Sequence, residues 1–189
     1  MLDQSSRFVR LLGLSGSIRS ASYSVAILRA LQGALGPGIK LEMADVRLPL
    51  YNEDEDGENT GAVVQAFRQA IAQVDGLVIS TPEYNHGIPG VLKNALDWAS
   101  RPSGKSVLKD KPVMIITNSP GLTGGVRAQA QMNETLLSVS SVILPGRQIV
   151  ISNVASKIKD GKFVDEANIE FAMAALHRLV GLCRLYPAA

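Results

Sequence analysis

The segment 81–98 contains the densest group of side chains that could bind a ligand. It reads Thr-Pro-Glu-Tyr-Asn-His-Gly-Ile-Pro-Gly-Val-Leu-Lys-Asn-Ala-Leu-Asp-Trp, and the apolar run 76–80 comes directly before it. This order predicts a buried strand, a polar loop and then a helix opened by Pro89. Ligands bind at such strand-to-helix junctions in α/β sheets. A carboxylate, a phenol, an amide and an imidazole follow one another in the loop, so they and the backbone could hold a polar ligand.

A second candidate site is the serine-rich segment 15–24, which follows the apolar run 9–14 and precedes a helical pattern. Free N–H groups and the positive end of the dipole at a helix N-terminus favour an anion. Serine hydroxyls and Arg19 add donors and a fixed charge, so a phosphate is the expected ligand. Alternatively, one of three serines only caps the helix: Ser20, Ser22 or Ser24. The position after the first strand favours the phosphate, because doubly wound folds bind phosphates there.

Two glycine-rich nucleotide motifs are excluded by their spacing. Ser15 and Ile18 stand where a G-x-G-x-x-G pattern that starts at Gly13 needs glycine. The segment 104–106, Gly-Lys-Ser, imitates the end of a Walker A loop, but Ala99 stands where that loop needs its first glycine. The phosphate prediction therefore depends on the serine-rich loop alone.

A third polar segment, Asn-Ser-Pro-Gly-Leu-Thr-Gly-Gly at 118–125, follows the apolar run 112–117. Two glycines at a helix start let backbone amides approach a ligand closely. In a sheet of order 2-1-3-4-5, the three strands that carry these polar loops are adjacent, and the topological switch point lies between the first and the third. One flat ligand with a phosphate tail could contact all three loops, and FMN has that shape.

The elements that must position these loops follow from the apolar pattern. Strands are expected at 9–14, 39–44, 76–80 and 112–117, with 141–144 and 148–151, split by Pro145-Gly146, as candidates for a fifth. Helices are expected at 25–35, 63–74, 89–99, 124–139 and 169–183. The regular alternation predicts an α/β fold with a parallel sheet and helices on both faces.

The composition describes a compact globular chain. Its 189 residues are most simply one domain, 1–189, with 46% hydrophobic and 19% charged residues. The net charge is +2 and the basic residues are scattered, which argues against nucleic-acid binding. The longest apolar runs have strand length, which argues against a membrane span. These features point to the cytoplasm.

Metal and disulfide chemistry have few candidates in this sequence. Cys183 is the one cysteine, which permits no internal disulfide and no zinc cluster, and it is expected to be buried on the last helix. The acidic segment 51–58 could bind a divalent cation, but isolated charge runs usually stay hydrated, so a solvated loop is the favoured interpretation. No metal site is predicted.

The three polar loops resemble those of the NAD(P)H-dependent FMN reductases, a family that includes bacterial quinone, chromate and azo-dye reductases. The matching segments are 16–24, 82–98 and 119–127, and the resemblance extends from Val9 to the last helix. It implies a flavodoxin-like three-layer sandwich with a five-stranded parallel sheet of order 2-1-3-4-5. It also implies FMN as cofactor, NADPH or NADH as co-substrate, and a homodimer or homotetramer.

The resemblance also implies roles for individual residues. Three would hold the FMN phosphate, with Ser22 as a helper: Ser17, Arg19 and Ser24. Four would surround the isoalloxazine ring: Pro82, Glu83, Tyr84 and Asn85. Three would close its other edge: Asn118, Ser119 and Gly121. Tyr84 and His86 are candidate substrate contacts, although Tyr84 could be an ordinary exposed aromatic and Asn85-His86 an ordinary turn.

The implied activity transfers a hydride from NAD(P)H through flavin N5 to quinones or other small acceptors, such as chromate, azo compounds or free flavin, by a ping-pong mechanism. Backbone N–H groups near 121–125 could stabilise the negative charge of the reduced ring. The preference for NADPH or NADH would depend on a basic residue near the ribose phosphate, and three candidates stay open: Arg19, Arg101 and Arg127.

Two other kinds of protein compete with a reductase. A flavodoxin-type carrier would bind FMN without turning over NAD(P)H, but such carriers tend to be strongly acidic, whereas this chain has a net charge of +2. A relative that has lost flavin is the second alternative, and the intact polar residues of all three loops argue against it.

Overall fold

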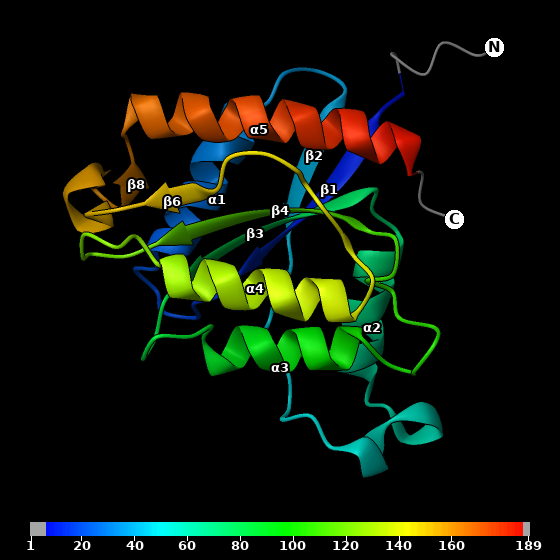
Figure 1. Cartoon of the computed structure of the whole chain (residues 1–189). Helices are drawn as coiled ribbons and strands as arrows, with labels where there is room; N and C mark the ends of the chain where they lie inside the picture. The colour runs from blue at the N-terminus through cyan, green and yellow to red at the C-terminus, as the bar shows by residue number, and fades with distance from the viewer. Residues whose placement is uncertain (1–6, 187–189) are drawn as a thin grey trace.

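The computed structural model describes residues 7–186, and a parallel sheet forms its centre (Figure 1). The strands are β1 (Val9–Ser15), β2 (Ile39–Met43), β3 (Gly76–Pro82), β4 (Pro112–Asn118), β5 (Val142–Ile143) and β6 (Ile149–Ile151). They run in the order β2-β1-β3-β4-β5 with β6 also beside β4, and all neighbours are parallel. The predicted order 2-1-3-4-5 is confirmed, because β5 and β6 together take the place of the fifth strand.

That fifth strand is broken at Pro145-Gly146. β5 pairs with Pro112 and Val113 of β4, whereas β6 pairs with residues 116–118. Proline has no N–H to donate to a ladder, and Gly146 has a φ of 128°, which residues with a side chain rarely adopt. The chain therefore leaves the edge of β4 at this point and returns to it further along.

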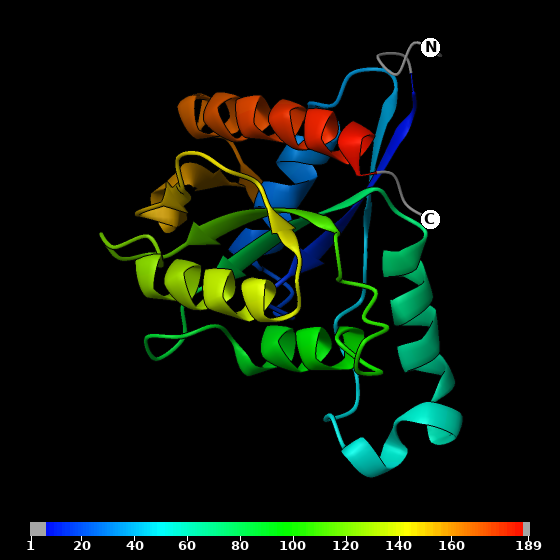
Figure 2. The ribbon, with the colours of Figure 1, turned by 45° about the vertical axis from the view of Figure 1, so that its right-hand side comes forward.

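Helices cover both faces of the sheet and bury two apolar cores (Figures 1 and 2). One face carries α1 (Tyr23–Gly33) and α5 (Glu166–Leu185), and the other carries α2 (Ala62–Ala72), α3 (Gly90–Ala99) and α4 (Val126–Ser138). Neighbouring residues of β3 belong to different cores. Val78 lies in the core beneath α1 and α5, and Ile79 lies in the core beneath α2, α3 and α4. Strands buried on both faces read as continuous apolar runs, which is why the sequence revealed them. None of the helices in residues 7–186 is long and apolar enough to cross a membrane.

The segment between β6 and α5 contains short elements that the sequence pattern does not reveal. They are the 3₁₀ helix η4 (Val154–Lys157) and an antiparallel hairpin of β7 (Ile158–Lys159) and β8 (Lys162–Phe163). Strands of two residues are too short to show a periodicity. Asp165 then caps α5 through the N–H of Asn168 and pairs with Lys157, and these contacts lower the pKa of its carboxyl to about 2.

The acidic segment 51–58 forms two single turns of 3₁₀ helix, η2 (Glu53–Glu55) and η3 (Gly57–Asn59). Its Asp56 pairs with Arg68 at 2.7 Å and with Arg101 at 3.4 Å. Within residues 7–186, no three His, Cys, Asp or Glu side chains are grouped so that they could hold a metal ion. The segment is therefore tied to the fold by arginines.

Cys183 is buried on α5, as predicted. Burial, together with the negative charge of Asp75, raises the pKa of its thiol to about 12. The thiolate is the reactive form of cysteine, so this side chain is unreactive near neutral pH.

Candidate active site

The carboxyl ends of β1, β3 and β4 bring three polar loops to one edge of the sheet, on the left in Figure 1. The register aligns Ser15 with Ser80 and Pro82 with Asn118, so the three strands end close to one another. The first loop is 16–22, the second 83–89 and the third 119–125. The predicted site residues all lie in these loops, at the strand ends, or in the first turn of α1.

The first loop presents unused hydrogen-bond donors at the N-terminus of α1. Five N–H groups of this loop and of the first turn of α1 have no hydrogen-bond partner among residues 7–186: those of Ile18, Ser20, Ala21, Tyr23 and Ser24. The dipole of α1 adds partial positive charge at the same place. Together these groups form a site that suits an anion.

Arg19 adds a full positive charge to this loop. Its Nη2 donates to the carbonyl of Ala21 at 2.7 Å, and its guanidinium lies 5.0 Å from the centroid of the Tyr23 ring. It forms no salt bridge with a carboxylate in the described part of the chain. A guanidinium has five N–H donors, so Arg19 keeps several for a phosphate.

The serines of the first loop differ in their surroundings. Ser22 caps α1, because its Oγ accepts the N–H of Val25 at 3.3 Å. Ser24 is only 1% exposed, and its Oγ accepts a hydrogen bond from Nδ2 of Asn118 at 2.9 Å. Ser17 lies near the start of the loop and is 7% exposed. Ser22 and Ser24 therefore support the loop, while each keeps its hydroxyl hydrogen for a further acceptor.

Gly16 marks the place where the first loop crosses the end of β3. Its N–H donates to the carbonyl of Ser80 at 2.8 Å. A Cβ at this position would lie 2.1 Å from Oγ1 and 2.6 Å from Cβ of Thr81, far inside van der Waals contact. The absence of a side chain at Gly16 therefore sets how closely the first loop lies against the end of β3.

The second loop contains a tight turn from Tyr84 to Gly87, whose N–H and C=O groups bond each other at 3.0 Å. Asn85 and His86 between them have φ values of 49° and 68°. Two positive φ values in a two-residue connection define a type I′ turn. The turn considered from the sequence is therefore present, and it carries the exposed side chains of Tyr84 and His86 at the rim of the site.

Glu83 ties the second loop to the start of α4. Its carboxylate accepts the N–H groups of Arg127 at 2.9 Å and Ala128 at 3.3 Å, in the first turn of α4. Nη1 of Arg127 lies 3.5 Å from the same carboxylate. A negative charge at a helix N-terminus is stabilising, so the Glu83 side chain acts as a cap supplied from another loop.

A Glu83→Ala variant is expected to lose about 1–2 kcal/mol of its free energy of unfolding, because α4 loses both the acceptor and the charge at its N-terminus. Glu83→Gln keeps an acceptor without the charge, so its free energy of unfolding should lie between those of Glu83→Ala and the parent. Thermal unfolding of the apoprotein measures both. Glu134→Ala, at an exposed carboxylate of the same helix, is the matched control and should change stability by less than about 0.5 kcal/mol. Equal stability of Glu83→Ala and the parent would contradict the capping role.

The third loop lies against the chain that follows β6. The N–H of Asn153 donates to the carbonyl of Gly121 at 3.1 Å, and the N–H of Gly121 donates to Oγ of Ser119 at 3.0 Å. Residues 122–125 form a turn, and the N–H groups of Leu122 and Thr123 at its start have no partner within residues 7–186. This loop thus faces the site with a second row of backbone donors.

Three supporting residues escaped the sequence analysis. Gln131 of α4 accepts the N–H of Ile88 at 2.7 Å, and Ser152 donates to the carbonyl of Leu122 at 2.7 Å. Thr81 is the residue that packs against the first loop at its glycine. The two hydrogen bonds join residues 43 and 30 positions apart, so no local pattern marks them.

The three arginines considered for nucleotide recognition lie in different places. Arg19 belongs to the first loop and Arg127 to the start of α4, both beside the site. Arg101 follows the far end of α3 and pairs with Glu53 and Asp56. Arg101 is therefore removed from the site and is held by two carboxylates.

A groove of about 920 Å³ adjoins the first loop at Ser20. It runs between α1 and the β7–β8 hairpin, and its charged lining residues are Arg29, Lys162 and Asp160. Phe163 adds an apolar wall. The anion site at the start of α1 is thus continuous with an open groove that carries an excess of basic side chains.

Comparison with known proteins relates this arrangement to flavin reductases. The profile of the family described as NADPH-dependent FMN reductase matches residues 9–156. An NAD(P)H-dependent FMN reductase of Pseudomonas aeruginosa is 38% identical over 173 residues, 90% of this chain and 93% of that protein. A 2-hydroxy-1,4-benzoquinone reductase of Burkholderia sp. is 40% identical over 153 residues, 80% of this chain and 83% of that protein. The solved structure of the Paracoccus denitrificans flavoenzyme FerB, an NAD(P)H:(acceptor) oxidoreductase, matches with a TM-score of 0.82 at 28% identity, covering 94% of this chain and 98% of FerB.

Proposed function

The chain belongs to the NADPH-dependent FMN reductase family, and we propose that it oxidises NAD(P)H with FMN as cofactor and reduces quinones or other small acceptors. The observation that carries the proposal is the group of unused N–H donors around Arg19 at the start of α1. Relatives named as quinone reductases support the class of acceptor. Chromate, azo compounds and free flavin are further acceptors within the proposal.

The residues of the first loop fit the phosphate of FMN. Five free N–H groups, the dipole of α1 and a guanidinium without a carboxylate partner among residues 7–186 match a dianion. We assign Ser17, Arg19 and Ser22 to the phosphate. Ser24 acts beside them mainly by holding Asn118 in place.

The second and third loops fit a flat ring between them. We assign Pro82, Glu83, Tyr84 and Asn85 to one edge of the isoalloxazine and Asn118, Ser119 and Gly121 to the other. When bound, FMN supplies the chemistry that no side chain here provides, since it accepts a hydride from NAD(P)H at N5 and gives it to the acceptor. With FMN bound, backbone N–H groups near 121–125 would stabilise negative charge on the reduced ring.

The rim of the site orients the two substrates. Tyr84 and His86 project from the type I′ turn and contact whichever substrate lies over the ring. The turn holds the backbone from which both side chains project, so the loop itself needs no ordering on binding. NAD(P)H and the acceptor use the same place in turn, which gives ping-pong kinetics.

An FMN carrier without NAD(P)H turnover is the alternative function. The mild net charge of +2 argues against a surface built for docking redox proteins. We further propose a cytoplasmic homodimer or homotetramer in which 1–189 acts as one domain. Light scattering on the purified protein tests the assembly, and a monomer at micromolar concentration would contradict it.

The decisive experiment is an absorption spectrum of the purified protein before and after anaerobic addition of NADPH. Flavin bands at about 370 and 450 nm that NADPH bleaches, and that menadione restores, are the expected result. Initial rates at several menadione concentrations should give parallel double-reciprocal lines. Bands that NADPH leaves unchanged would favour the carrier, and failure to bind added FMN would overturn the assignment of all three loops.

A further inference from the structure

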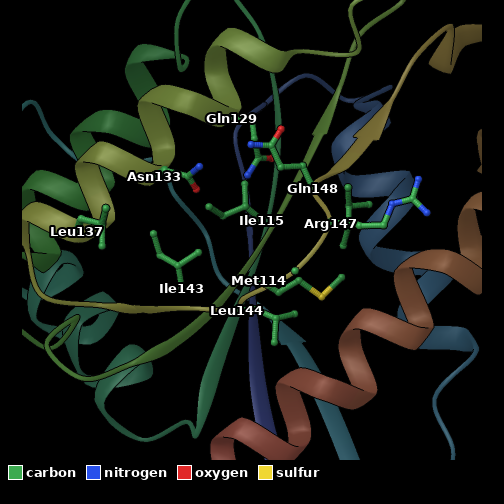
Figure 3. A pocket seen from close by; sticks show the side chains of 11 residues that line it. Met114, Ile115, Gln129, Asn133, Leu137, Ile143, Leu144, Arg147 and Gln148 are labelled. Carbon is green, nitrogen blue, oxygen red and sulfur yellow. The ribbon is translucent and has the colours of Figure 1, made fainter.

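A pocket of about 350 Å³ lies where the fifth strand is broken, between α4 and the split edge of β4 (Figure 3). Its walls are mainly apolar: Met114, Ile115, Leu137, Ile143, Leu144 and Ile149. None of its lining residues belongs to the three loops of the active site. The pocket is therefore a separate feature, created by the interruption at Pro145-Gly146.

The interruption leaves a backbone donor of β4 facing the pocket. Ile115 lies between the two ladders and pairs with neither β5 nor β6. Two residues earlier, the carbonyl of Val113 accepts the N–H of Leu144 at 2.8 Å on this side of the strand. Backbone groups alternate along a strand, so the N–H of Ile115 points to the same side, where the chain has left the sheet.

Gln129 of α4 supplies an unpaired amide at the same place. Its side chain is only 4% exposed, and its Oε1 is buried without a hydrogen-bond partner within residues 7–186. Among the two polar atoms of this amide, only Oε1 is fully buried without a partner in that part of the chain. A buried amide without partners costs free energy, so a native protein keeps one where something else completes its hydrogen bonds.

The pocket has no charge aimed into it. Arg147 lines its mouth, but its guanidinium points away from the other lining side chains (Figure 3) and lies 5.6 Å from the centroid of the Phe171 ring. No acidic residue lines the pocket, and its remaining polar side chains are the neutral amides of Asn133 and Gln148. A neutral ligand therefore suits the pocket better than an ion, because a charge there would be desolvated without an opposite charge.

We propose that this pocket binds a small neutral molecule with an apolar body and one carboxamide group. A carboxamide matches Gln129 reciprocally once the side-chain amide turns its buried Oε1 toward the pocket. The ligand N–H then donates to Oε1 while its oxygen accepts from Nε2. The same oxygen can accept the N–H of Ile115. The apolar body then fills the space between Met114, Leu144 and the helix, where apolar walls favour burial.

Benzamide is the probe that tests the proposal, on the FMN-loaded protein by nitrogen-15 NMR. We expect saturable binding with a dissociation constant of about 1 mM or below, as for a good fragment of this size. The Ile115 N–H and the Gln129 side-chain amide should shift, while the visible flavin spectrum stays unchanged. Benzoate and acetophenone, which lack the amide donor, should bind at least about fivefold more weakly.

Gln129→Leu keeps the size of the side chain and removes both hydrogen-bonding atoms. It should weaken benzamide binding about tenfold or more without loss of FMN content, and should not lower the melting temperature, because it removes a buried unpaired amide. Gln69→Leu makes the same change at an exposed residue of α2, outside the pocket, and should leave binding unaltered. Benzamide that shifts the flavin spectrum, binds Gln129→Leu as well as the parent, or shows no saturation at about 10 mM would overturn the proposal.

Discussion

A Gly16→Ala variant is expected to lose most of its bound FMN and to unfold at a clearly lower temperature than the parent. The added methyl would lie 2.1 Å from Oγ1, 2.6 Å from Cβ and 3.0 Å from Cα of Thr81. Turning the Thr81 side chain relieves only the first of these contacts, so the backbone of the first loop must move. Overpacking of this kind costs about 1–3 kcal/mol, which lowers the melting temperature of a chain of this length by roughly 2–12 °C. Differential scanning calorimetry and the flavin-to-protein absorbance ratio measure the two effects.

Gly33→Ala is the matched control, because a Cβ on this last residue of α1 would meet nothing within 4 Å. It should leave FMN content unchanged and raise stability slightly, since alanine is the better helix former. Adding Thr81→Ala to Gly16→Ala removes the contact at 2.1 Å but keeps the one at 2.6 Å, so only partial recovery is expected. Parental melting temperature and FMN content in Gly16→Ala would show that the first loop can move away from Thr81 without cost.

The sheet could be predicted because its physical cause is local in the sequence. Strands buried on both faces are continuous apolar runs, and helices of different amphipathic pattern separate them. Even the broken fifth strand was visible, since Pro145-Gly146 lies between two short apolar runs. The β7–β8 hairpin was missed, because two-residue strands carry no pattern that could reveal them.

The hydrogen bonds that hold the site residues in place could not be predicted, because they join residues that are far apart in the sequence. Asn118 and Ser24 hold each other across 94 positions, and Glu83 caps a helix that begins more than 40 positions later. From the sequence, Glu83 and Asn118 could be assigned only to the ligand. The structure adds that their side chains also bind the protein, so substitutions at either residue change the scaffold together with the site.

The Asn85-His86 turn shows why two interpretations of one segment need not exclude each other. Asparagine and histidine tolerate positive φ better than most residues, which makes the pair suitable for a type I′ turn. The same turn aims Tyr84 and His86 outward at the edge where the three strands end. The turn interpretation is therefore confirmed, while the substrate contacts of Tyr84 and His86 stay a prediction that the turn permits.

An Arg19→Ala variant is expected to bind FMN about 10- to 100-fold more weakly, which corresponds to the loss of a charge-assisted contact of about 1.5–3 kcal/mol. Its guanidinium has no carboxylate partner among residues 7–186, so its removal leaves no buried charge behind and should not disturb the fold. Quenching of flavin fluorescence on titration of the apoprotein measures the dissociation constant. The same titration with riboflavin, which lacks the phosphate, should give nearly equal constants for the variant and the parent.

Arg29→Ala is the matched control, since Arg29 lies two turns further along α1, outside the first loop. It should leave FMN affinity within about twofold of the parent, because charge at an exposed helical position is strongly screened. Arg19→Lys should recover part of the FMN affinity, since lysine restores the charge without the planar fork of donors. The ratio of FMN to riboflavin affinity separates contact with the phosphate from general damage to the site. If Arg19→Ala weakens both ligands equally, Arg19 acts through the shape of the loop and not through the phosphate.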